Sequence, residues 1–185
     1  MEALGIEKYS VVGHSMGGYV SLAMLDKYAS NLKSITLLSS TTSADSQEKC
    51  DRRRREIELI RAGKKNMLAR LVPHQGFAPE NVKRLKEYIE DLSELILITE
   101  DEGVIAILGG MIERQSRGEQ LRDCGIPHMF IFGRHDHYIP IEVAEEMIAA
   151  DDKAKVVWLE HSGHMGFIEE PELCAEEIKQ IVMRG

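Results

Sequence analysis

The sequence predicts an α/β fold in which a mostly parallel half-sheet of four strands is flanked by helices. Short apolar runs alternate along the chain with stretches whose apolar residues recur at helical spacing. The apolar runs are continuous and lack clean alternation with polar residues, which is typical of parallel strands covered on both faces. At 185 residues the chain is long enough for one domain with a hydrophobic core.

The expected elements follow one another in βαβ order. The four expected strands are short apolar runs at residues 9–15, 34–40, 128–133 and 155–159. Helices are expected at residues 16–28, directly after the first strand, and at residues 141–150 and 171–184. Alternation of this kind implies parallel strands joined by right-handed crossovers.

A helical insertion is expected between the second and third strands. Residues 52–62 read as a helix stopped by Gly63, and residues 79–92 as another, with Pro79 suited to a first helical position. Residues 99–102 have the form of a capping box that opens a third helix. The predicted organisation is therefore a partial α/β core, residues 1–44 and 120–185, with a helical cap at residues 45–119.

Charge and cysteine content exclude several classes of function. The chain has 23 basic and 31 acidic side chains, a net charge of −8, which disfavours binding to nucleic acid or to an anionic membrane. No apolar stretch reaches the length of a membrane span, and no signal-peptide pattern opens the chain. Three widely spaced cysteines suit neither a disulfide framework nor a zinc site, so a cytoplasmic location is expected.

The strongest chemical signal is the sequence GHSMGG at residues 13–18. Small residues two places before and after Ser15 permit a sharp turn from strand to helix, which exposes the serine above the sheet. This turn places the N–H of Met16 beside Ser15, and the dipole of the following helix favours a developing oxyanion there. The position after an apolar run and before an amphipathic helix is the context that this motif requires.

A serine nucleophile needs a base, which is itself held by an acid. Asp136 lies in a polar segment directly after the third expected strand, and His164 lies in the segment after the fourth. The carboxyl ends of parallel strands meet at one edge of a sheet, so Ser15, Asp136 and His164 are expected to converge. They also occur in the chain order serine, acid, histidine.

Residues 13–18, 133–140 and 161–172 resemble the nucleophile elbow, acid loop and histidine loop of the α/β-hydrolase superfamily, and the resemblance covers the chain from end to end. It implies a covalent acyl-serine intermediate, with Ser15 as nucleophile, Asp136 as acid and His164 as base, and with Met16 N–H in the oxyanion hole. It also implies that the helical insertion is the family's cap, which shapes the substrate pocket. No cofactor and no metal are implied.

Other assignments compete for these roles. Asp45 follows the second strand, where some members of the superfamily keep the acid, although it also suits the start of a cap helix. His161 lies three residues before His164, and the resemblance favours His164 as the base. In this family the residue at His14 usually packs beside the elbow. The histidines at positions 135 and 137 could chelate zinc, but a metal site would leave the serine motif unexplained.

Compared with the superfamily, the chain lacks the first four strands and the loop that supplies the second oxyanion donor. Losing one such donor typically lowers turnover about a hundred- to thousandfold. The strand at residues 9–15 is then expected to have a free apolar edge, and we expect a homodimer that covers it.

The expected function is hydrolysis of a small carboxylic ester or related acyl compound by a serine hydrolase. The same triad also serves carbon–carbon bond hydrolysis and acyl transfer. A further alternative is a catalytically silent chain that works through ligand or partner binding, which the missing oxyanion loop favours and the intact triad disfavours.

Overall fold

The computed structural model describes residues 1–184 and divides the chain into two compact units. Met1–Thr42 and the segment that begins at Arg117 form the sheet unit, and Ser43–Ser116 form the helical unit. The residues proposed for catalysis all belong to the sheet unit.

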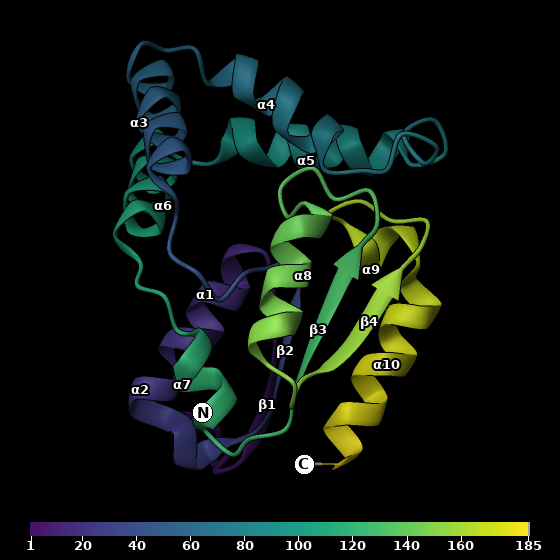
Figure 1. Ribbon diagram of the computed structural model, residues 1–185. Helices are drawn as coiled ribbons and strands as arrows, with labels where there is room; N and C mark the ends of the chain where they lie inside the picture. The colour runs from purple at the N-terminus through teal and green to yellow at the C-terminus, as the bar shows by residue number, and fades with distance from the viewer. Residues whose placement is uncertain (185) are drawn as a thin grey trace. The chain divides into compact units, whose positions relative to one another are not determined.

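The sheet has four strands, all parallel, in the order β1, β2, β3, β4 (Figure 1). Their bounds are Tyr9–His14 for β1, Leu32–Leu38 for β2, His128–Gly133 for β3 and Lys155–Leu159 for β4. Gly133 at the end of β3 pairs with Leu159 at the end of β4, so these two strands finish at the same level of the sheet. The predicted fold class is confirmed, because the strands alternate with helices and pair in parallel.

Helices cover both faces of this sheet. They are α1 (Met16–Ala23), α2 (Leu25–Tyr28), α7 (Gly118–Asp123), α8 (Ile141–Ala150), α9 (Gly166–Glu169) and α10 (Pro171–Arg184), with 3-10 turns at Glu2–Leu4 and Ala29–Asn31. Alternate residues of β3 point to opposite faces: Phe130 and Phe132 pack in one core with α1, α2, α7 and α8, whereas Met129 and Ile131 pack with α10. Figure 1 shows α8 and α10 on opposite sides of the strands.

The helical unit consists of two helix pairs. Its elements are α3 (Gln47–Arg61), α4 (Lys65–Gln75), α5 (Lys86–Ile98) and α6 (Asp101–Glu113), with α3 against α6 and α4 against α5. Its two ends are joined by the fully buried carboxylate of Asp45, which forms ion pairs with Arg53 and Arg114. Arg114 also donates to the carbonyl of Ser43 at 2.9 Å.

Helix bounds in this unit differ from those expected. The helix expected from Pro79 begins at Lys86, because residues 79–85 form turns in which Asn81 Oδ1 accepts from Arg84. Thr99 does not cap α6: its hydroxyl donates back to the Leu95 carbonyl at 2.7 Å and closes α5 instead. The helix α4 lies within the stretch expected to be helical, although no separate helix was given for Lys65–Gln75, and Pro73 lies inside it.

The strand order leaves β1 at one edge of the sheet, paired with β2 alone. Val12 on this strand is 44% exposed, and Val20 on the following helix is 57% exposed. A homodimer through this edge stays a prediction.

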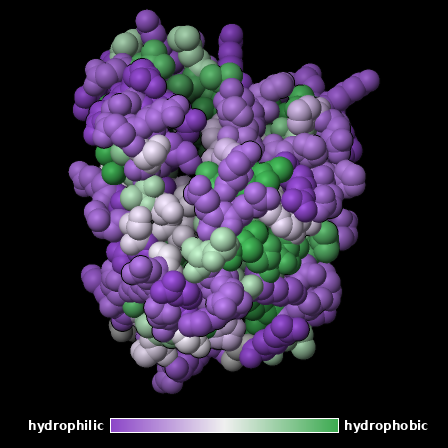
Figure 2. All heavy atoms as spheres, viewed as in Figure 1, coloured by the Kyte–Doolittle hydropathy of each residue, from purple (hydrophilic) through white to green (hydrophobic). Residues whose placement is uncertain are grey.

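The face of the molecule drawn in Figure 2 is mostly hydrophilic, with hydrophobic residues gathered over β3 and β4. Among residues 1–184, no helix combines the length and the apolar character needed to cross a bilayer.

Candidate active site

Ser15 occupies the turn between β1 and α1 with φ 51° and ψ −116°. This is an uncommon backbone conformation for a residue with a side chain, and such strain clusters at functional positions. Three hydrogen bonds hold the backbone of the turn. The N–H of Ser15 donates to the Leu38 carbonyl at 2.9 Å, and the carbonyl of Ser15 accepts from Gly18 N–H at 3.0 Å and from Ser40 Oγ at 2.8 Å. The strained conformation is therefore fixed by the surrounding structure.

Close packing around the turn explains two of its glycines. A Cβ atom on Gly13 would lie 2.4 Å from the carbonyl oxygen of Gly17, and one on Gly18 would lie 2.2 Å from Ser40 Oγ. Gly17 itself has open space at that position. The sharp turn thus depends sterically on Gly13 and Gly18.

A buried acid–base pair lies in the loops after β3 and β4. His164 Nδ1 is 2.8 Å from Asp136 Oδ2 and 3.0 Å from Asp136 Oδ1. The side chain of Asp136 is fully buried and that of His164 is 8% exposed. Asp136 Oδ1 also accepts from the backbone N–H groups of Tyr138 at 2.8 Å and Ile139 at 3.0 Å, which fixes the carboxylate.

This pairing determines which nitrogen of His164 can act as a base. A carboxylate only accepts hydrogen bonds, so Nδ1 of His164 carries the proton that points at Asp136. In the neutral ring Nε2 then has a free lone pair. The ring is further held by Tyr138, whose ring lies edge-on to it with centroids 5.0 Å apart.

The two loops are fastened to each other. The N–H of His135 donates to the Ser162 carbonyl at 2.9 Å, and a Cβ atom on Gly133 would lie only 2.0 Å from the carbonyl oxygen of Gly163. Glu169 accepts from Gly163 N–H at 2.8 Å, so the short helix α9 anchors the histidine loop.

The end of β1 reaches the histidine loop through the residue before the serine. His14 Nε2 is 2.8 Å from the carbonyl oxygen of His164, and the two rings are 4.9 Å apart. Within residues 1–184 no hydrogen bond joins Ser15 Oγ to His164 itself. Catalytic hydrogen bonds are often long in the absence of substrate and tighten in the reactive complex.

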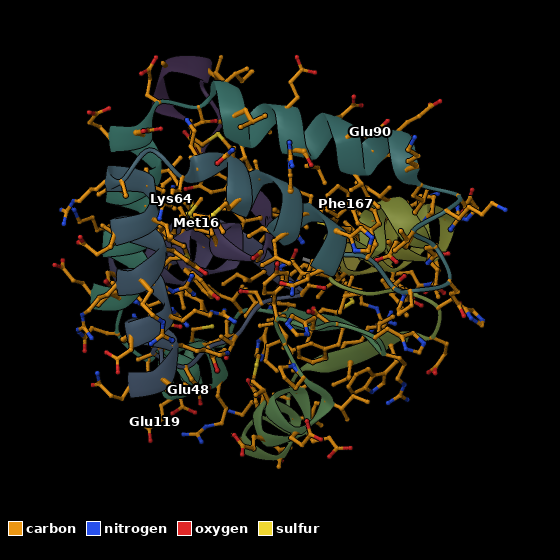
Figure 3. All side chains as sticks on the ribbon, turned by 90° about the horizontal axis from the view of Figure 1, so that it is seen from above. Met16, Glu48, Lys64, Glu90, Glu119 and Phe167 are labelled. Carbon is orange, nitrogen blue, oxygen red and sulfur yellow. The ribbon has the colours of Figure 1, made fainter. Side chains whose placement is uncertain are left out.

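Met16 begins α1, and the first N–H groups of a helix have no acceptor within it. Its backbone N–H is thus suited to bind an anion beside Ser15. Figure 3 looks down on the carboxyl ends of the strands and labels Met16 of α1 and Phe167 of α9, whose side chains are both partly exposed.

The residues that the sequence offered as alternatives to Asp136 and His164 make other contacts. Burial opposes ionisation of Asp45, but hydrogen bonds from Arg53 and Arg114 outweigh this effect and lower its pKa. His161 is exposed, and its backbone N–H donates to Glu170 at 2.9 Å. Across the part of the chain that the structure describes, no three histidine, cysteine or acidic side chains group as metal ligands.

Two supporting residues escaped the sequence analysis. Ser40 lies 25 positions after Ser15 and contacts it only through the pairing of β1 with β2. Tyr138 contacts His164 only because both loops leave neighbouring strands. No local motif marks either residue, although Ser40 ends the expected strand at residues 34–40 and Tyr138 lies in the segment that follows the expected strand at residues 128–133, where polar residues of an α/β protein gather.

A parallel sheet that carries its polar residues beyond the carboxyl ends of its strands is the architecture of many enzymes that convert small molecules. A strained serine at a sharp turn from strand to helix is the form of the nucleophile elbow of α/β-hydrolases. The chain belongs to the alpha/beta hydrolase fold family, whose model matches residues 1–171. The resemblance seen in the sequence is thereby confirmed.

Solved structures agree with this assignment. A thermophilic esterase from Thermogutta terrifontis is 28% identical, with a TM-score of 0.90 over 99% of this chain and 68% of its own. An enol-lactonase from Burkholderia xenovorans LB400 is 20% identical, with a TM-score of 0.86 over 99% of this chain and 68% of its own. An esterase from Exiguobacterium antarcticum is 21% identical, with a TM-score of 0.82 over 98% of this chain and 69% of its own. No curated protein sequence matches the chain.

Family membership and the first of these neighbours support hydrolase activity. The two neighbours below 25% identity support the fold.

Proposed function

We propose that the chain is a serine hydrolase that cleaves a small carboxylic ester or related acyl compound through an acyl-serine intermediate. The observation that carries this proposal is the pairing of His164 Nδ1 with both oxygens of the buried Asp136. His14, the residue before Ser15, contacts the backbone of His164. A buried carboxylate in this position selects the histidine tautomer that accepts a proton at Nε2.

In the first half of the reaction, His164 Nε2 takes the proton of Ser15 Oγ as Oγ forms a bond to the substrate's carbonyl carbon. The carbonyl oxygen becomes an oxyanion, for which Met16 N–H at the start of α1 is the candidate donor. The tetrahedral intermediate then breaks its bond to the alcohol, which leaves with the proton held by His164.

In the second half, His164 removes a proton from water as the water oxygen attacks the acyl carbon. Collapse of this second intermediate releases the carboxylic acid and returns the proton to Ser15 Oγ. Asp136 stays ionised throughout and stabilises the charged form of His164. Side chains and water supply every proton and bond, so the proposal requires no cofactor.

The ester as substrate class is supported by the esterase from Thermogutta terrifontis, which is 28% identical over almost the whole of this chain. The role of the helical unit as a cap over the substrate stays a prediction, as does a cytoplasmic location.

Hydrolysis of p-nitrophenyl esters from acetate to octanoate, by the wild type beside Ser15→Ala, tests the proposal. We expect turnover in the wild type with a preferred chain length, and none above background in the variant. Equal rates in both proteins would contradict the proposal. No rate in either would favour the silent alternative.

Addition of methanol separates hydrolysis from acyl transfer. Formation of the methyl ester at the expense of free acid would indicate that the acyl-serine is transferred to alcohols in preference to water.

A further inference from the structure

His14 is the last residue of β1 and directly precedes the serine turn. Its side chain makes three contacts with the histidine loop and its helix. Nε2 is 2.8 Å from the backbone carbonyl oxygen of His164, and the ring lies 4.9 Å from the His164 ring at 57° and 4.9 Å from the Phe167 ring at 66°. One side chain therefore touches both the main chain and the ring of the proposed base.

The hydrogen bond defines the protonation of His14. A carbonyl oxygen can only accept, so His14 Nε2 must carry a proton. Burial, and next the neighbouring His164, lower the pKa of His14 to about 4, so the ring is a neutral donor near pH 7. A neutral ring adds no positive charge beside His164, which must itself become charged during the reaction.

Asp136 holds Nδ1 of His164, and the Tyr138 ring lies edge-on to the imidazole, so both of these contacts act on the side chain. The hydrogen bond from His14 acts on the backbone of His164. Since His14 is joined to Ser15 by a single peptide bond, its hydrogen bond to the His164 carbonyl sets the distance between the serine turn and that backbone. The His14 ring, whose centroid lies 4.9 Å from that of the His164 ring, also limits movement of that ring.

We propose that His14 is a positioning residue, which ties the serine turn to the backbone of His164 and so aligns Nε2 of the base with Ser15 Oγ. This inference rests on the proposed serine-hydrolase function. His14 acts through His164 and does not itself bond to substrate.

Three variants separate its hydrogen bond from its shape. His14→Phe keeps a ring of similar size and loses the donor, whereas His14→Gln places an amide N–H at the reach of the original Nε2. His135→Phe makes the same exchange at an exposed histidine of the acid loop, and serves as the matched control.

We expect His14→Phe to lower kcat about ten- to a hundredfold, with KM within about twofold, because misalignment of the base affects the transition state more than substrate binding. His14→Gln should recover most of the loss, and His135→Phe should match the wild type. A kcat for His14→Phe equal to that of the wild type would overturn the inference. Failure of His14→Gln to recover activity, in a variant that melts like the wild type, would overturn it as well.

A second readout does not depend on turnover. The proton on His164 Nδ1, held by a carboxylate, should give a downfield NMR signal in the wild type. We expect this proton to exchange faster with water in His14→Phe and at the wild-type rate in His14→Gln. If the wild type proves inactive, the proposed function fails, whereas unchanged exchange in His14→Phe would overturn the positioning role by itself.

Discussion

Replacing Asp136 with asparagine should remove nearly all activity while leaving the fold in place. Asp136 Oδ1 accepts from the N–H groups of Tyr138 and Ile139, so the oxygen of the new amide is held there and its NH₂ group faces His164 Nδ1. An NH₂ group only donates, which forces His164 Nδ1 to accept and moves the ring proton to Nε2. The base then has no lone pair to take the proton of Ser15.

The lost charge sets the size of the effect. Asp136 Oδ2 is 2.8 Å from His164 Nδ1, and both side chains are nearly excluded from water. With an effective dielectric constant of about 20, a carboxylate at this distance stabilises the imidazolium by about 6 kcal/mol. At about 1.4 kcal/mol for each factor of ten, kcat is expected to fall by about four orders of magnitude.

The assay is the initial rate on the preferred p-nitrophenyl ester, with thermal unfolding of each protein measured beside it. Asp151→Asn is the matched control, because Asp151 Oδ2 is 2.9 Å from Nε2 of His128 in a second buried pair, at the start of β3. The control should melt at a lower temperature and keep its kcat. The reasoning is refuted if Asp136→Asn retains kcat within about tenfold of the wild type, or if Asp151→Asn loses as much.

Three further results are expected from the structure. Gly133→Ala should destabilise the fold by about 1–3 kcal/mol in urea unfolding, because the new Cβ would lie 2.0 Å from a backbone oxygen. Gly17→Ala, where the Cβ meets open space, should leave the stability unchanged, and equal stability of the two variants would contradict this reasoning. The pKa of His14 is lowered from 6.5 to about 4, so the unfolded chain binds a proton that the folded chain excludes between these values. The free energy of unfolding of the wild type, compared with that of His14→Phe, should therefore be highest above pH 6.5 and fall by about 3 kcal/mol towards pH 4. Parallel pH curves for the two proteins would refute the assignment. Sedimentation should detect a dimer that Val12→Lys converts to monomer, since a charge on an edge strand opposes pairing, and a monomeric wild type would contradict it.

The sheet unit was predictable because its signals are local. Strands β3 and β4 and the helices α8 and α10 have the bounds that their apolar patterns indicated. Each is a continuous apolar run or an amphipathic repeat, so the pattern of its own residues indicates where it begins and ends and which face is buried.

The helical unit was less predictable, since its boundaries depend on contacts between segments distant in the sequence. No short stretch of sequence indicates the start of α5 at Lys86 or the long-range ion pair of Asp45 with Arg114. Polar side chains of this kind can either cap a nearby helix or bind a distant partner, and tertiary contacts determine which of the two they do.

For the site, the sequence motif pointed to Ser15, Asp136 and His164, and the structure brings Asp136 and His164 into contact. Supporting contacts could not be found in this way. The hydrogen bonds from Ser40 to Ser15 and from His14 to His164 join residues of different strands and loops, and arise only once the sheet is assembled.

Covalent labelling with a fluorophosphonate tests the central claim most directly, because the phosphonate reacts much faster with an activated serine than with an ordinary one. Mass spectrometry of digested wild-type protein should locate one adduct on Ser15. His164→Ala should label far more slowly, and Ser15→Ala not at all. An adduct on another residue, or labelling that is as fast in His164→Ala as in the wild type, would contradict Ser15 and His164 as nucleophile and base.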